Sequence, residues 1–218
     1  MHVAVWADIV CPWCYLGAAR FDAALGQFEH RAEVEVRYHS FELDPGSPAG
    51  VTQPVLDMLA VKYGMTAAQA AAAEGRVQDL AQAEGLDFTI DRAFGSTRAA
   101  HRLLQYAQAR GHGRAMLTAL YQAYFGAGRP VFDEPGLAAV AADAGLEAGQ
   151  AQAAQTDAQA GRQVADDAAQ ARRLGITGVP FYLIGGSRAV SGAQPTAVFL
   201  AALRAAWDDA AAPHVAPA

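Results

Sequence analysis

The chain has 218 residues, of which 53% are hydrophobic and 17% charged, and this is the composition of a globular protein with one core and an insertion, or with two small domains. The net charge is -6 at pH 7 and the sequence contains no run of basic residues, which argues against nucleic acid as a partner. No apolar stretch is long enough to span a bilayer and no charged leader precedes the first predicted strand, so we expect no membrane partner and a cytoplasmic location.

The N-terminal segment predicts a strand, a helix and a second strand. Residues 2–10 are rich in apolar side chains and predict a buried strand. Pro12 suits the first turn of a helix, which the apolar spacing extends to about residue 28. Residues 33–43 alternate between apolar and polar side chains and predict a second strand. A right-handed crossover through the helix makes the two strands parallel, and the turn residues 44–48 end the unit.

Most of the segment from residue 52 to residue 174 predicts helix, because Ala and Gln propagate helices well. Thr66 and Gln69 form a capping box that opens one of these helices. Further helices are predicted over residues 116–125, 135–144, 147–160 and 161–174. The charged residues of the run 164–173, Asp167 among them, are interpreted as a solvated helix face.

The periodicity changes in the C-terminal part. Residues 179–184 predict a strand, residues 185–187 a tight turn, and residues 188–190 the return strand of a hairpin. A last helix is predicted from residue 194 onward. This hairpin can join the first two strands in one sheet only if the helical segment is an insertion. We therefore expect one discontinuous domain, residues 1–48 plus 175–212, and a helical insertion domain, residues 49–174.

The only two cysteines of the chain stand at the start of the first predicted helix, in the sequence Cys11-Pro12-Trp13-Cys14. Unpaired N–H groups at a helix start favour an anion, so we predict that Cys11 is the nucleophilic thiolate. Cys14 lies one turn further along the same face and is the candidate resolving thiol. The pattern therefore predicts a thiol–disulfide exchange site.

Other interpretations of the cysteine pair stay open. Either thiol could be an unreactive buried side chain, although a disulfide that closes so short a loop adds little as a structural cross-link. A zinc ion would normally take four ligands, and the six histidines show no spacing that supplies them, so we expect no metal.

Several motifs in combination resemble a known family. The Cys-x-x-Cys helix start and the later Val179-Pro180 before a hairpin resemble the thioredoxin superfamily, and the large helical insertion resembles its DsbA branch. A closer resemblance, to FrnE-type oxidoreductases of the DsbA family, is carried by Trp6–Gly17, Ser40–Leu43, Gly178–Phe181 and Gly192–Pro195. The resemblance covers essentially the whole chain and implies an α/β thioredoxin-like fold with an all-helical insertion. Some FrnE-type proteins carry further C-terminal cysteines, which this chain lacks, so we expect no second disulfide relay.

The resemblance also implies a second part of the site. Pro180 is expected to follow a cis peptide bond and to face Cys11, which leaves the Val179 backbone free to pair with an extended substrate. A trans proline at a strand start is the alternative. The helix face that bears His101 is expected to look toward the dithiol, where His101 would stabilise the thiolate or contact substrate, with a packing histidine as the alternative.

Aromatic and acidic residues near the cysteines are further candidates. Trp13 is expected to expose its ring and to offer apolar contact to a substrate, whereas Trp6 is expected in the core. Asp8 and Glu42 are candidates for proton transfer to or from the buried thiol, with a capping or solvated carboxylate as the alternative.

We expect an enzyme that oxidises, reduces or isomerises protein disulfides without an organic cofactor. Its expected partners are protein clients and small thiols, with glutathione as a candidate redox partner. The alternative is a glutathione-dependent isomerase or transferase that acts on a small aromatic or polyketide-like compound. The related isomerases and kappa-class glutathione transferases typically place serine at the position of Cys11, so the cysteine pair favours disulfide chemistry. A chaperone-like binder is a third interpretation, and the direction of electron flow and association into a homodimer stay open.

Overall fold

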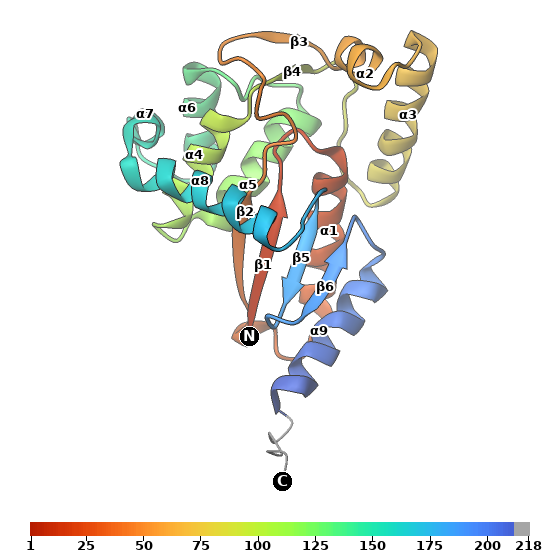
Figure 1. The fold of residues 1–218 in the computed structure, drawn as a ribbon, viewed down its shortest axis with the longest axis vertical. Coiled ribbons are helices and arrows are strands. Elements are labelled where there is room, and N and C mark those ends of the chain that lie inside the picture. Colours follow the sequence, from red (N-terminus) through yellow and green to blue (C-terminus); the bar gives the residue numbers. More distant parts are fainter. Residues whose placement is uncertain (212–218) are drawn as a thin grey trace.

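The computed structural model describes residues 1–211, and within them a four-stranded sheet forms the centre of the fold (Figure 1). Its strands, in the spatial order β2-β1-β5-β6, are β1 (His2–Ala7), β2 (Glu35–Ser40), β5 (Phe181–Ile184) and β6 (Arg188–Ser191). β1 and β2 are parallel, whereas β5 pairs antiparallel with both β1 and β6. The predicted strand–helix–strand unit and the later hairpin therefore join one sheet, as the sequence predicts.

Two helices cover one face of this sheet. α1 (Pro12–Gln27) connects β1 to β2, and α9 (Thr196–Ala211) follows β6 and packs along α1. The ring of Phe21 on α1 lies 5.2 Å from that of Tyr182 and 5.6 Å from that of Phe199 on α9. Because side chains alternate across a strand, Trp6 points to the opposite face, where it is fully buried as predicted.

The segment between β2 and β5 is mostly helical, as expected. Its elements are β3 (Thr52–Pro54), α2 (Val55–Tyr63), α3 (Ala67–Ala83), β4 (Ala93–Gly95), α4 (Arg98–Gln108), α5 (Gly113–Tyr121), the π-helical turn η2 (Gln122–Gly126), α6 (Glu134–Asp143), α7 (Gln150–Thr156) and α8 (Ala158–Arg173). The capping box of Thr66 and Gln69 at the start of α3 is confirmed. The antiparallel pair of β3 and β4 was not predicted, since strands of three residues show no clear period.

The helical segment covers the upper end and one side of the sheet in Figure 1. The α2–α3 hairpin stands above the start of α1, while α4, α5 and α8 pack against β2. Along the described chain, no helix combines the length and apolarity that crossing a membrane requires.

The prediction that Asp167 lies on a solvated helix face is wrong. Asp167 on α8 is fully buried, and its carboxylate lies 2.8 Å from Nδ1 of His39 and accepts the backbone N–H of Ser40 at 2.8 Å. The partners stand far away in the sequence, so local charge patterning could not show the burial.

The predicted division of the chain into two domains stays a prediction. One apolar core contains residues of both parts, for example Tyr15 on α1 and Phe125 in η2, whose rings stack at 5.0 Å. The predicted end of the discontinuous domain, residue 212, lies outside the described residues.

Candidate active site

The two cysteines lie at the upper end of β1, where the chain turns into α1. Cys11 is the N-cap residue of α1, Pro12 occupies its first turn, and the Cys11 carbonyl accepts the N–H of Cys14 at 2.9 Å. Both cysteines are present as thiols, on the same turn and almost fully buried within the protein. Cys11 therefore stands at the positive end of the α1 dipole, which favours a thiolate, although its side chain accepts no hydrogen bond from the first helical N–H groups.

The two thiols differ in their surroundings. Burial, together with the neighbouring Cys11, raises the pKa of the Cys14 thiol well above its usual range, while a hydrogen bond from the backbone N–H of Asp8 acts in the opposite direction. Cys14 therefore holds its proton at neutral pH. A buried thiol that keeps its proton until the second step suits the resolving role.

The loop before β5 meets the dithiol. The Val179–Pro180 peptide bond is cis, and the Cys11 thiol donates to the Val179 carbonyl at 3.6 Å. Pro180 also lies against α1, with its Cγ 3.0 Å from the point where a Cβ on Gly17 would stand. The structure thus brings Cys11, Val179 and Pro180 together, although they come from opposite ends of the chain.

A cavity of about 480 Å³ opens beside Cys11. α2 and α3 form its far wall, the start of α1 and the Gly178–Val179 loop form its near wall, and most of its lining is apolar. The lining includes Val10, Leu43, Val55, Met58, Leu59, Met65, Val77, Leu80 and Phe94. Trp13 stands at this cavity with 45% of its surface exposed, in agreement with the prediction that its ring is accessible.

A buried ion pair in the cavity wall was not predicted. Nη2 of Arg92 lies 2.8 Å from Oε2 of Glu74 on α3, and both side chains are nearly inaccessible. The Arg92 guanidinium also stacks over the rings of Phe88 and Phe125, at 4.6 and 4.9 Å from their centroids. In the sequence, both charged residues look like ordinary surface residues, so no signal was available.

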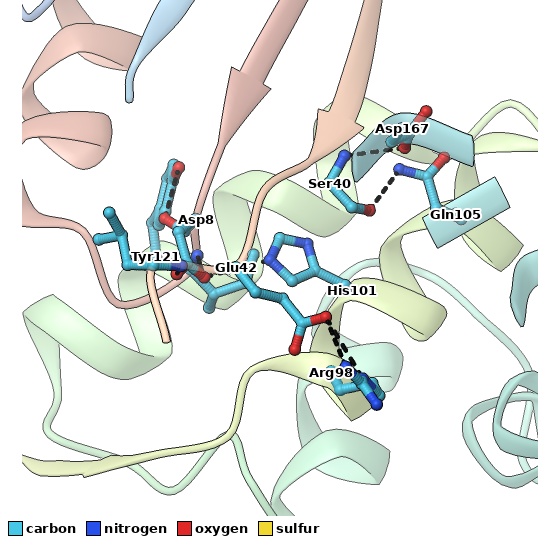
Figure 2. A network of polar contacts seen from close by, with 10 residues as sticks. Asp8, Ser40, Glu42, Arg98, His101, Gln105, Tyr121 and Asp167 are labelled. Carbon is cyan, nitrogen blue, oxygen red and sulfur yellow. Dashed lines mark hydrogen bonds and ion pairs between the residues drawn. The ribbon is translucent and has the colours of Figure 1, made fainter. Parts of the chain in front are cut away.

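The prediction that His101 contacts substrate is wrong for this structure. His101 on α4 is fully buried, and its Nε2 lies 3.1 Å from Oδ1 of Asp8 (Figure 2). The burial follows from the packing of α4 against β2, which encloses the ring. His101 reaches the dithiol region only through Asp8.

The two acidic candidates have different surroundings. The Asp8 carboxylate is buried and accepts the backbone N–H groups of Ile9 and Leu43, each at 2.7 Å. Glu42 pairs with Arg98 on α4 at 3.2 Å, as Figure 2 shows. Asp8 is therefore the carboxylate that stands next to the cysteines. Within the described residues, no group of three or more side chains is arranged to hold a metal ion.

Three of the solved structures that match this chain each cover nearly all of it. A probable DsbA oxidoreductase from Streptomyces coelicolor is 46% identical, with a TM-score of 0.91 over 100% of this chain and 92% of that one. The cytosolic disulfide reductase DsbM from Pseudomonas aeruginosa, crystallised with glutathione, is 22% identical, with a TM-score of 0.61 over 97% and 98%. A 2-hydroxychromene-2-carboxylate isomerase is 16% identical, with a TM-score of 0.70 over 97% and 98%.

The last two matches show a shared fold alone, because their sequence identity is low. The profile of the DSBA-like thioredoxin domain matches residues 2–204, which is nearly the whole chain. The cysteine pair at the start of α1, the sheet and the helical insertion all lie within this match. This chain is a member of the DSBA-like thioredoxin domain family.

Proposed function

We propose that this protein is a thiol–disulfide oxidoreductase that acts on polypeptide disulfides. The observation that carries the proposal is the placement of Cys11 at the N-terminus of α1, with the protonated thiol of Cys14 on the same turn and the Val179 carbonyl 3.6 Å away. A dithiol of this kind exchanges disulfides without a metal or an organic cofactor.

The reaction in the reducing direction has two steps. The Cys11 thiolate attacks one sulfur of the substrate disulfide, forms a mixed disulfide and releases the other substrate sulfur as a thiolate that takes up a proton. Cys14 then loses its proton and attacks the Cys11 sulfur, which forms the Cys11–Cys14 bond and releases the second substrate thiol. The enzyme loses two electrons and the substrate gains them, and the reverse sequence oxidises a substrate dithiol.

The cavity supports a substrate with an apolar group beside its sulfur. Aliphatic, thioether and aromatic side chains line the wall next to Cys11, and the flexible thioethers of Met58 and Met65 adapt to different shapes. The exposed ring of Trp13 adds apolar contact at the mouth. The cytosolic reductase crystallised with glutathione supports a cytoplasmic role, with glutathione as the small-thiol partner.

A second candidate is a glutathione-dependent isomerase or transferase. The observation that favours it is the size and apolar lining of the cavity, which suits a small aromatic molecule, together with the shared fold of the hydroxychromene isomerase. Such chemistry would use the thiolate of glutathione and would not require both protein thiols.

Reduction of insulin by dithiothreitol tests the proposal. The wild-type protein should accelerate it, and Cys11→Ser should abolish the acceleration because no nucleophile remains. Cys14→Ser should trap the mixed disulfide and stop turnover. Wild-type activity that both substitutions leave intact would falsify the proposed mechanism.

The same variants separate the other candidates. Isomerisation or conjugation of an aromatic substrate by glutathione that persists in Cys14→Ser would support the isomerase. Protection of an unfolded client by the double variant, without any exchange activity in the wild type, would indicate a chaperone.

A further inference from the structure

Asp8 connects the dithiol to the helical segment through its side chain. Its carboxylate accepts the backbone N–H groups of Ile9 and Leu43, and Oδ1 faces Nε2 of His101 at 3.1 Å (Figure 2). An ionised carboxylate has only acceptor atoms, so the ring nitrogen that faces it carries a hydrogen. His101 thus completes the hydrogen bonds of a buried negative charge.

The backbone of Asp8 contacts the cysteines directly. Its N–H is hydrogen-bonded to the Cys14 sulfur, and its carbonyl accepts the N–H of Cys11 at 3.3 Å and the hydroxyl of Tyr121 at 3.4 Å. A change in the anchoring of the Asp8 side chain therefore moves the N–H that faces the Cys14 sulfur.

Two effects of Asp8 on Cys14 oppose each other. The backbone N–H lowers the pKa of the thiol, whereas the negative charge of the Asp8 carboxylate raises it. An N–H donor on His101 offsets that charge. Loss of this donor would leave the carboxylate charge less compensated in a buried site, where Coulomb interactions are strong.

We propose that Asp8 and His101 are positioning residues for the resolving step, in which Cys14 closes the disulfide with Cys11. The pair holds the Asp8 N–H against the Cys14 sulfur and limits the repulsion between the carboxylate and the Cys14 thiolate. The inference rests on the proposed function, since it concerns the second step of the same exchange.

Other titratable groups also face Cys14. They are Cys11 and Asp22 on α1, Tyr38 on β2, Tyr121 on α5 and Tyr182 on β5. Burial raises the pKa of Tyr121 and Tyr182 well above the usual range, so both stay neutral through neutral and mildly alkaline pH. Burial also raises the pKa of Asp22 and of Tyr38.

The chain offers a matched control in a second buried His–Asp pair. His39 on β2 faces Asp167 on α8 at 2.8 Å, and Asp167 also accepts a backbone N–H, that of Ser40. This pair likewise joins the sheet to the helical segment. Nothing within residues 1–211 hydrogen-bonds it to either cysteine.

The ring-closing step can be measured with dithiobis-nitrobenzoate. One equivalent of the reagent converts reduced protein into a mixed disulfide on Cys11 and releases a first thionitrobenzoate. Cys14 then displaces the second, whose release is followed as a function of pH. His101→Leu should move the profile of the second release to higher pH and slow it about tenfold at neutral pH, the effect of about one unit in thiol acidity.

Two further variants test whether His101 acts through Asp8. His101→Gln keeps an N–H donor at the position of Nε2 and should restore most of the rate. In an Asp8→Asn background, His101→Leu should cause no additional shift of the pH profile, because the asparagine carries no negative charge that the loss of His101 could leave uncompensated. His39→Leu should lower the free energy of unfolding without moving the profile. Should His101→Leu fail to fold, His101→Asn, whose shorter amide does not reach Asp8, replaces it.

The outcomes are separable. A wild-type protein that releases a single thionitrobenzoate overturns the proposed function and this inference together. Release of two, with a profile that His101→Leu and His101→Asn leave unmoved, overturns the inference alone. An equal shift in His39→Leu would show that any loss of packing has the effect, and would also overturn it.

Discussion

Gly17 is the residue that lets the cis-proline loop approach α1. A Cβ at this position would stand 3.0 Å from Cγ of Pro180, 3.0 Å from the hydroxyl of Tyr182 and 3.4 Å from Cα of Ala193. The Pro180 atom belongs to a closed ring, the Tyr182 side chain is buried, and the Ala193 atom is backbone, so these neighbours have little room to move aside. The absence of a side chain at Gly17 is therefore part of how the site is assembled.

We expect Gly17→Ala to lower the free energy of unfolding by about 1 kcal/mol. Overpacking typically costs about 1–3 kcal/mol, and the better helix propensity of Ala returns up to about 1 kcal/mol. Insulin reduction should also slow, because Pro180 is pushed away from Cys11. Urea unfolding and the turbidity assay measure the two effects.

Gly26 provides the control on the same helix. Apart from its chain neighbours and the nearby backbone of its own helix, no atom of the described residues lies within 4 Å of the position that its Cβ would take. Gly26→Ala should therefore raise the free energy of unfolding by about 0.5–1 kcal/mol and leave activity unchanged. Equal effects of the two substitutions would contradict the close approach at Gly17.

At the scale of one element, α3 depends on few contacts. Its buried residues are Ala70, Glu74, Val77 and Ala81, so the helix buries little apolar area. The ion pair of Glu74 with Arg92 replaces part of that missing packing and holds α3 over the cavity.

Glu74→Ala should therefore destabilise the protein by about 3–5 kcal/mol, because it leaves the Arg92 charge buried and unpaired. The double variant Glu74→Leu with Arg92→Met should recover most of that loss, since neither partner then carries a charge. Denaturant unfolding of the three proteins measures both quantities. A loss below about 1 kcal/mol for Glu74→Ala would show that water reaches the guanidinium.

The elements also show what the sequence could and could not predict. The capping box at Thr66 was predictable because both partners lie within one helical turn. The strand β3 was not, since Pro54 ends it after three residues and its partner β4 lies some forty residues away. The burial of Glu74 was not predictable either, because it depends on Arg92, which lies outside the same helix.

At the scale of the whole molecule, alkaline pH should unfold this protein. Burial raises the pKa of Tyr38, Tyr121 and Tyr182 well above the ordinary value, and that of Tyr124 to about 12. Above about pH 10 the unfolded chain releases these phenolic protons while the folded protein keeps them. Stability present below that pH is therefore lost as the pH rises.

We expect the free energy of unfolding to fall by up to about 1.4 kcal/mol per pH unit for each such tyrosine above about pH 10. Urea titrations from neutral to strongly alkaline pH, with tyrosinate absorbance as a second probe, measure the slope. Tyr182→Phe should reduce the slope of the free energy of unfolding against pH by the contribution of one tyrosine. A free energy that is constant to pH 11 would mean that these hydroxyls reach solvent.

The order of strands and helices was enough to predict the sheet and the insertion, because each unit obeys local rules of period and turn chemistry. The links between the units were not predictable. Asp8 meets His101 and His39 meets Asp167 across 93 and 128 residues, and each of the four is an ordinary polar residue in its own segment. Only the packing of α4 and α8 on the strands brings them together.

The cavity holds the one lysine of the chain, Lys62, at its edge beside Leu43. Its amine pairs with Asp44 at 3.3 Å, and about a third of its side chain is exposed to solvent. Apart from the amino terminus, an amine-directed fluorophore therefore has a single attachment point, in the wall of the cavity that Trp13 and Cys11 also line. Without any engineering, this protein accepts an optical reporter where a bound partner would change its emission.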